Sequence, residues 1–197
     1  MTADHIQGIC WSITYILLIV YAIQFKTHGI PLIAVCLNFA WETVALGGSL
    51  LNQNFSSVLI IHTAWFALDC IIIFLFYCYE TKIKENRKEK VVFAWAYIIC
   101  VVCLVILFLN GYMLLSCFVI DLIMAVSFLV FLISKPIYIG WNIYAVGVFK
   151  LLGDLFAWRY YRDVFLVDYI GIAVLAWNIF YLLTLVVKTY IEHKQRN

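Results

Sequence analysis

The chain is a series of long apolar runs separated by short polar or charged segments. Each run has about 20 residues, the length that an α-helix needs to cross the hydrocarbon core of a bilayer. Helix is expected because lipid offers no hydrogen-bonding partner to unpaired backbone groups. The pattern therefore predicts an all-α membrane bundle of seven transmembrane helices that forms a single domain, 1–197. The predicted spans are 6–25, 31–51, 58–79, 91–109, 112–134, 137–158 and 164–187.

The segments between the runs constrain how the helices are connected. Asn110 and Gly111 form a connector too short for anything but an antiparallel hairpin, so the fourth and fifth helices should be neighbours. Pro31 and Pro136 suit the first turns of the second and sixth helices, because a first turn leaves its N–H groups unpaired. The first apolar run lacks the basic flank and the cleavage site of a secretory signal, so we interpret it as a retained span.

The composition agrees with a membrane protein. Hydrophobic residues make up 66% of the chain and charged residues 12%, whereas a soluble domain is about half apolar and about a quarter charged. We therefore expect an integral, multi-pass protein of a cell membrane or endomembrane, with the lipid bilayer as its surroundings. Nucleic acid is not an expected partner, because three glutamates are interleaved with the basic residues of the 80–90 linker.

Lysine and arginine are distributed unevenly between the two ends of the predicted bundle. Ten of them lie on one side, and two, Arg159 and Arg162, lie on the other. Because positively charged connectors stay in the cytoplasm, we predict that the N-terminus is outside or lumenal and that the C-terminus is cytosolic. The 80–90 linker is then cytoplasmic.

The seven cysteines all fall within apolar runs, where a thiol behaves as a small apolar side chain. Cys100 and Cys103 have the spacing of a metal or redox motif, but no second pair of cysteines or histidines accompanies them. We therefore expect no disulfide framework, no metal site and no cofactor.

Five ionisable side chains interrupt the predicted spans: Glu42, Asp69, Asp121, Lys150 and Asp154. A charge at mid-helix costs roughly 2.5–3.5 kcal/mol on insertion scales, so such groups usually face the interior of the bundle. Glu42 and Asp69 each lie about 12 residues from the start of their helix, which places both near the membrane midplane. Since neither has a cation nearby in the sequence, we interpret these two carboxyls as functional and expect them to approach each other in one cavity.

Helical spacing offers structural interpretations for other polar residues. Lys150 and Asp154 are four residues apart, and a structural ion pair, which Asp121 could join, is the simpler interpretation. Asn38 and Asn178 fit interhelical hydrogen bonds as well as they fit ligand binding.

Aromatic residues share faces with the acids. His62, Trp65 and Asp69 follow a three-to-four step along the third span, and Trp177 and Tyr181 lie at a similar depth on the seventh. We expect a pocket with acids at its floor and aromatic walls, entered from the lipid or the outer face. The residues near span ends, which fit interfacial positions, are His62, Trp11, Trp95 and Trp158.

Such a pocket has a definite chemistry. A carboxyl held away from water keeps its proton and becomes a usable general acid. It could protonate an epoxide or alkene of an apolar substrate that enters from the membrane. The resulting cation would be stabilised by the faces of Trp and Tyr rings, and dry walls would keep water from quenching it. These properties fit acid-initiated cyclisation of a terpene.

Two motifs carry a family resemblance. The stretch 35–42 contains N-x-x-W-E, from Asn38 through Trp41 to Glu42, and Trp65 with Asp69 gives W-x-x-x-D. In these motifs, and in length and span number, the chain resembles the small seven-helix membrane terpene cyclases of fungal meroterpenoid and indole-diterpene pathways. The resemblance implies a hydrophobic isoprenoid or prenylated substrate.

The resemblance also implies two catalytic acids, a glutamate in the second span and an aspartate in the last. Glu42 fits the first. The late D-x-x-Y pattern of the family falls here on Asn178 and Tyr181, and an amide cannot donate a proton as a carboxylic acid does. Either Asp69 or Asp154 supplies the second acid, or this member has a different activity.

The sequence thus predicts a site and leaves three functions open. The catalytic candidates are Glu42, Asp69 and Asp154, and the substrate-binding candidates are Asn38, Trp41, Trp65, Asp121, Lys150, Trp177, Asn178 and Tyr181. A membrane terpene cyclase is the first function. A small-molecule or proton-coupled transporter, with buried acids as relay groups, is the second, and a non-catalytic membrane module with a structural polar network is the third.

The predicted orientation leads to a labelling experiment. Single cysteines placed in the 80–90 linker and in the 52–57 turn of a cysteine-free variant should react with an impermeant maleimide from opposite sides of the membrane. Only the turn should be labelled in intact cells. Labelling of both sites from the same side would contradict the seven-span arrangement.

Overall fold

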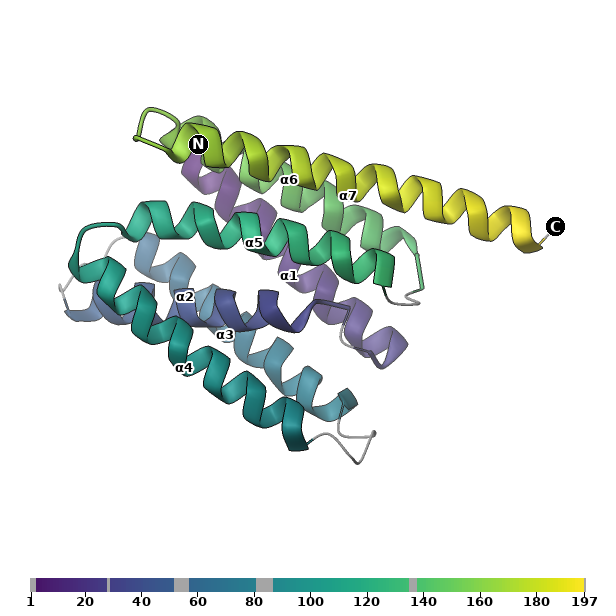
Figure 1. Ribbon diagram of the computed structural model, residues 1–197, viewed down its shortest axis with the longest axis horizontal. Helices are drawn as coiled ribbons and strands as arrows, with labels where there is room; N and C mark the ends of the chain where they lie inside the picture. Colours follow the sequence, from purple (N-terminus) through teal and green to yellow (C-terminus); the bar gives the residue numbers. More distant parts are fainter. Residues whose placement is uncertain (1–2, 28, 52–56, 81–86, 135–137, 197) are drawn as a thin grey trace.

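The computed structural model describes residues 3–27, 29–51, 57–80, 87–134 and 138–196, and these form seven α-helices without any strand. The helices are α1 (Ala3–Phe25), α2 (Leu32–Leu51), α3 (Ser57–Glu80), α4 (Arg87–Leu109), α5 (Met113–Ser134), α6 (Trp141–Tyr161) and α7 (Val167–Arg196). They run up and down through the bundle in chain order (Figure 1). The predicted all-α bundle of seven helices is confirmed.

Six of these helices, all except α6, are long and apolar enough to cross a membrane. The α6 helix has 21 residues but buries Asn142, Lys150 and Asp154. It connects the end of the bundle where α5 stops with the opposite end, where α7 begins (Figure 1), so it makes the same crossing as its neighbours. The protein is therefore an integral, multi-pass membrane protein, as predicted.

All helix boundaries but one lie within four residues of the predicted span ends, and the exception is the end of α7. The α7 helix continues to Arg196 instead of ending at 187, and it protrudes from the bundle (Figure 1). Its 30 residues exceed the roughly 20 that are needed to cross the hydrocarbon core of a bilayer. The helix continues beyond the apolar run because its backbone hydrogen bonds do not depend on apolar side chains. The α6 helix begins at Trp141 rather than at 137, and Pro136 lies outside the described residues.

The connector between α4 and α5 is a tight turn, as its sequence predicts. Gly111 has φ +77°, a left-handed conformation that glycine adopts without steric cost. The amide of Tyr112 donates to the carbonyl of Leu107 at 2.9 Å, and the amide of Gly111 donates to that of Phe108 at 3.0 Å. This pair of bonds is the Schellman ending of a helix. The two helices are therefore antiparallel neighbours.

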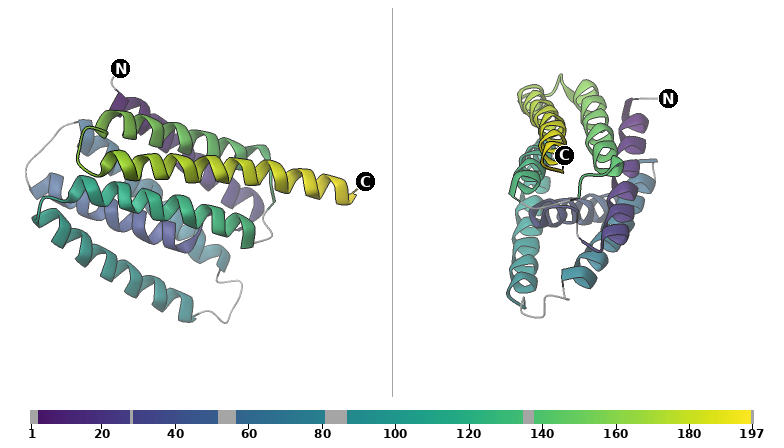
Figure 2. Two further views of the ribbon diagram at one scale, coloured as in Figure 1. Left: turned by 45° about the horizontal axis from the view of Figure 1, so that its top comes forward. Right: turned by 90° about the vertical axis from the view of Figure 1, so that its right-hand side faces the viewer.

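The helices form two groups with a pair of helices between them, and the groups also touch directly where α1 meets α3. Viewed along the bundle, α1, α6 and α7 lie on one side, α3 and α4 lie on the other, and α2 and α5 lie between them (Figure 2, right). The chain termini lie at opposite ends (Figure 1). Which end faces the cytosol stays a prediction. Residues 52–56 and 81–86, which belong to the turn and the linker of the labelling experiment, lie outside the described part of the chain.

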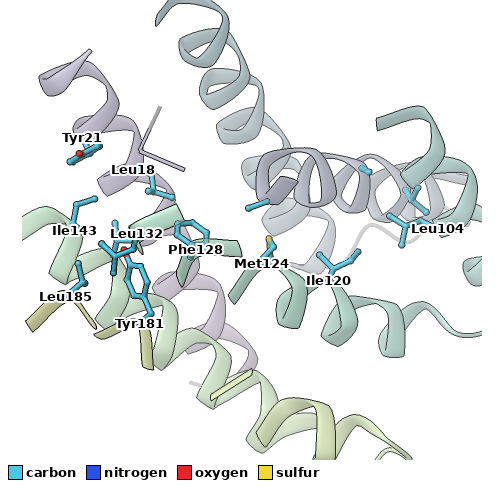
Figure 3. Close-up of a cluster of buried hydrophobic side chains, with 14 residues drawn as sticks. Leu18, Tyr21, Leu104, Ile120, Met124, Phe128, Leu132, Ile143, Tyr181 and Leu185 are labelled. Carbon is cyan, nitrogen blue, oxygen red and sulfur yellow. The ribbon is translucent and has the colours of Figure 1, made fainter. Parts of the chain in front are cut away.

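The apolar core follows the contact between these groups. Figure 3 shows one cluster that extends from Tyr21 on α1 across Phe128 on α5 to Tyr181 on α7. The rings of Phe128 and Tyr181 meet edge to face at 6.1 Å. Tyr21 is fully buried, and its hydroxyl donates to the carbonyl of Tyr138 at 3.2 Å. This core fixes α1 and α7 relative to α5.

Glycines let α6 approach both of its neighbours closely. A Cβ atom on Gly147 would lie 2.6 Å from Leu182 of α7, and one on Gly153 would lie 2.8 Å from the ring of Trp11 on α1. Small residues at helix contacts have this function in membrane proteins, where close packing drives association.

The contact at Gly153 can be tested by substitution. Gly153→Ala should lower the free energy of unfolding by about 1–3 kcal/mol, because the Trp11 ring must move away from the new methyl group. Gly47→Ala is a matched control within α2, where nothing lies within 4 Å of the position that the new methyl group would take. It should be neutral or stabilising by up to about 1 kcal/mol. Thermal unfolding in detergent would measure both, and equal midpoints would contradict the packing argument.

Candidate active site

Among the described residues, four buried ionisable side chains lie in two groups of polar contacts. We call the first the acid cluster, which consists of Tyr15, Asn38, Glu42, His62 and Asp69 from α1, α2 and α3. We call the second the ion-pair cluster, which consists of Trp11, Lys150, Asp154 and Asn178 from α1, α6 and α7. Both groups include residues of α1, so this helix lies between them.

Glu42 is the most deeply buried acid. It is 1% exposed, and its Oε2 atom lies 2.7 Å from Nδ1 of His62 on α3. The histidine side chain is 16% exposed, and its ring meets Trp65 edge-on at 5.8 Å. The carboxyl thus has a specific hydrogen-bonding partner that can carry or release a proton.

Asp69 has different partners. Its Oδ2 atom accepts a hydrogen bond from Nδ2 of Asn38 at 2.8 Å, and the hydroxyl of Tyr15 also hydrogen-bonds to this carboxyl. Asn38 additionally donates to the Tyr15 hydroxyl. Glu42 lines a small cavity together with Tyr15 and Asn38, the partners of Asp69, so the two acids lie in one region of the bundle. The expectation that they share one cavity is wrong, because Asp69 lines a different cavity.

Aromatic rings line the acid cluster. Trp65 is 9% exposed, and its Nε1 donates to the hydroxyl of Ser12 at 3.0 Å. Tyr15 stacks on Trp65 with ring centres 6.4 Å apart and also contacts Trp11 at 6.3 Å. The hydrogen bond satisfies the indole N–H and leaves the ring faces available for packing or binding.

The ion-pair cluster is centred on Asp154. Its Oδ2 atom accepts hydrogen bonds from Lys150 Nζ at 2.7 Å and from Asn178 Nδ2 at 2.6 Å. Its Oδ1 atom accepts one from Trp11 Nε1 at 3.1 Å. Lys150 Nζ also lies 5.0 Å from the centre of a Trp11 ring. The predicted pairing of Lys150 with Asp154 is confirmed, and the interpretation of Trp11 as an interfacial anchor is wrong, because its indole binds a buried carboxylate.

A cavity of about 120 Å³ lies beside the acid cluster. Its lining comes from the beginning of α1, α3 and α5 and the end of α6, which places it toward the end of the bundle predicted to be outside or lumenal. A second cavity of about 30 Å³ has Glu42 in its lining. The two share five lining residues: Gln7, Trp41, Trp65, Cys117 and Asp121.

Two side chains of this shared lining have oxygen atoms without a hydrogen-bond donor among the described residues. Asp121 accepts no hydrogen bond from another described residue, but it interacts with Asp154 and Lys150 through its charge, as the sequence suggested. The Oε1 atom of Gln7 is buried without a hydrogen-bonding partner within the described part of the chain. Buried polar atoms normally have partners, so the buried Oε1 atom of Gln7 and the half-buried carboxyl of Asp121 are available to a ligand or to water.

The structure gathers some predicted site residues and separates others. Trp41 and Trp65 line both cavities beside the acid cluster, as expected. Asn178 binds Asp154, whereas Tyr181 packs in the apolar core. Trp177 is 37% exposed on α7 and contacts Phe180, so the structure does not bring it to this site.

Sequence reasoning missed three contributors to the site: His62, Tyr15 and Gln7. His62 shares a helix face with Trp65, which was a usable signal, but its position near a span end favoured an interfacial role. Tyr15 follows Trp11 by four residues on α1, and this spacing also places them on one face. Gln7 gives no such signal, because it lies at the polar beginning of the chain.

The chain is similar to known proteins along most of its length. A family model described as Pyr4-like transmembrane terpene cyclases matches residues 2–187. The Pyr4-family terpene cyclase mfmH of Annulohypoxylon moriforme is 36% identical over 68 residues, which are 34% of this chain and 27% of that protein. Terpene cyclase macJ of Penicillium terrestre is 34% identical over 110 residues, which are 53% of this chain and 39% of that protein.

Terpene cyclase pyr4 of Aspergillus fumigatus is 29% identical over 68 residues, which are 34% of this chain and 27% of that protein. The aligned stretches therefore span well under half the length of these curated relatives. No solved structure matches the chain.

The ion-pair cluster predicts an asymmetric response to mutation. Lys150→Met alone should destabilise the fold by about 3 kcal/mol or more, since it leaves the Asp154 carboxylate without its cation. Adding Asp154→Asn removes the unbalanced charge but keeps a carbonyl acceptor, so the double variant should recover much of the loss. Unfolding midpoints in detergent would measure this, and a double variant no more stable than the single would contradict a buried pair.

Proposed function

The chain belongs to the Pyr4-like transmembrane terpene cyclases, and we propose that it cyclises an isoprenoid or prenylated lipid inside the membrane, starting with a proton from Glu42. The observation that carries the proposal is the position of Glu42. This carboxyl is 1% exposed, is bonded to His62 and lines a cavity walled by Trp41 and Trp65.

The proposed first step is a proton transfer. A carboxyl removed from water favours its protonated form and can act as a general acid. The O–H bond of Glu42 breaks as its proton bonds to an epoxide oxygen or an alkene carbon of the substrate. The electron-deficient carbon that results is attacked by a neighbouring alkene, which closes a ring. Loss of a proton from the last cation ends the reaction, so the product is an isomer of the substrate.

The walls of the cavity suit a cationic intermediate. The faces of Trp41 and Trp65 can stabilise positive charge through the ring quadrupole. Asp121 provides a carboxyl on the same lining that accepts no hydrogen bond from another described residue. Lys150 does not oppose this chemistry, because its charge is balanced by Asp154 in the separate ion-pair cluster.

The second acid is better sought in Asp69 than in Asp154. Asp154 accepts hydrogen bonds from an ammonium, an amide and an indole, so we assign it a structural role together with Asn178. Asp69 accepts from neutral groups and lines a cavity of about 20 Å³ that also includes Asn38 and Tyr15. We propose that Asp69 holds these two side chains in place and serves as the second carboxyl of the site.

Cavity size bears on how the substrate enters. The two connected cavities, about 120 and 30 Å³, are smaller than the roughly 300–1,000 Å³ of typical ligand sites. A prenyl chain can bind if side chains move or if part of the chain stays among the lipids. Entry from the bilayer is consistent with an apolar substrate. Both functions would use the same buried acids, so the acids do not distinguish a cyclase from a transporter. Family membership favours the cyclase.

Replacement of Glu42 tests the proposal directly. Glu42→Gln keeps the shape of the side chain but removes the acid, so turnover should fall by roughly 10² or more. Membranes carrying each variant would be incubated with prenylated phenols, with and without a terminal epoxide, and products separated by chromatography and mass spectrometry. Asp168→Asn is a matched control, because Asp168 binds Trp158 away from the cavity. Its activity should be unchanged.

Two results would contradict the proposed function. Full activity of Glu42→Gln would exclude Glu42 as the proton donor. Uptake of the substrate into vesicles without a new product would indicate the transporter instead.

A further inference from the structure

An acid that starts a cyclisation must satisfy two opposed requirements. It has to hold its proton until the substrate arrives, which burial in apolar surroundings favours. It then has to give that proton to a weakly basic alkene or epoxide, and burial opposes this because the carboxylate left behind is poorly solvated. The site therefore needs a hydrogen-bond donor that stabilises the carboxylate form of the acid.

His62 has the position of such a donor. Its Nδ1 atom lies 2.7 Å from Glu42 Oε2, a length typical of a charge-assisted hydrogen bond. In the tautomer with its proton on Nδ1, the ring donates to Glu42 and leaves the other carboxyl oxygen free to carry the acidic proton. The edge of the ring packs against Trp65, which fixes its orientation. Asp69 has only an amide and a phenol as donors among the described residues.

We infer that His62 is the positioning residue that makes Glu42 a strong enough acid to start the reaction, by donating from Nδ1 to the carboxylate as the proton leaves. The inference rests on the proposed function and deepens it. In the step itself, the O–H bond of Glu42 breaks and an O–H or C–H bond forms on the substrate. The N–H bond of His62 stays intact, and its hydrogen bond to Oε2 strengthens as negative charge develops.

The same geometry allows small changes at His62. The side chain lines the larger cavity and is 16% exposed, so substitutions there need not disturb the apolar core. His62→Leu removes the donor while filling most of the space. His62→Asn keeps an N–H group at the position of Nδ1, the atom that binds Glu42. Thr63→Val is the matched control on the next residue of α3, where the side chain is exposed and bonds only its own helix.

The expected result is a loss of kcat rather than of binding. Removal of one donor that stabilises developing negative charge costs about 10²–10³ in kcat, so His62→Leu should lose roughly 10² or more with little change in KM. His62→Asn should retain a larger part of the activity, and Thr63→Val should be unchanged. The loss in His62→Leu should be larger for an alkene substrate than for its epoxide, since the epoxide oxygen is easier to protonate.

A purely structural role of His62 would not produce this dependence on substrate basicity. Wild-type kcat in His62→Leu would overturn the inference. So would equal losses in His62→Leu and His62→Asn on both substrates, accompanied by a lower unfolding midpoint.

A spectroscopic measurement separates this inference from the proposed function. The infrared carboxyl band of Glu42, identified as the band missing from Glu42→Gln, should shift in His62→Leu and stay in place in Thr63→Val, with no substrate present. If the wild-type protein forms no cyclic product but the band still shifts in His62→Leu, the proposed function is overturned and the hydrogen bond between His62 and Glu42 is supported. An unshifted or absent band would overturn the inference about His62.

Discussion

A charged group inside a membrane protein has to find its partners within the bundle, because lipid supplies none. Asp154 satisfies this constraint by accepting hydrogen bonds from three donors: Lys150 on its own helix α6, Asn178 on α7 and Trp11 on α1. The glycines of α6 allow the close approach that these bonds require. The α6 helix, which buries three polar side chains, is thereby linked to α1 and α7, and the arrangement of these three helices depends on this carboxylate.

The two polar clusters differ in how far they are closed. Both oxygens of Asp154 have protein donors, so the ion-pair cluster has little left to offer a ligand. The acid cluster borders two cavities, and the linings of these cavities include Glu42, His62 and Asp121. Chemistry is expected at the acid cluster, because a substrate needs polar groups that the fold has not already used.

Asn178 occupies the position where the family resemblance implies an aspartate. In this chain the amide donates to Asp154, one helix away, and Lys150 balances the charge. A carboxyl is thus present near that position, but on α6 and with its proton-accepting sites occupied. We therefore propose Asp69 as the second acid, while Asn178 links α7 to α6 through Asp154.

The sequence by itself determined the class of protein, the number of helices and nearly all their boundaries, because the length of each apolar run is set by the thickness of the bilayer. It also identified Glu42 through a local motif and the Lys150–Asp154 pair through its one-turn spacing. These features depend on neighbours in the sequence. The partners of Glu42, Asp69 and Asp121 depend instead on how α1, α2, α3 and α5 pack and rotate. Only the tertiary structure placed His62 on Glu42, turned Trp11 inward and left Asp121 facing a cavity, since such contacts between distant helices have no period along the chain.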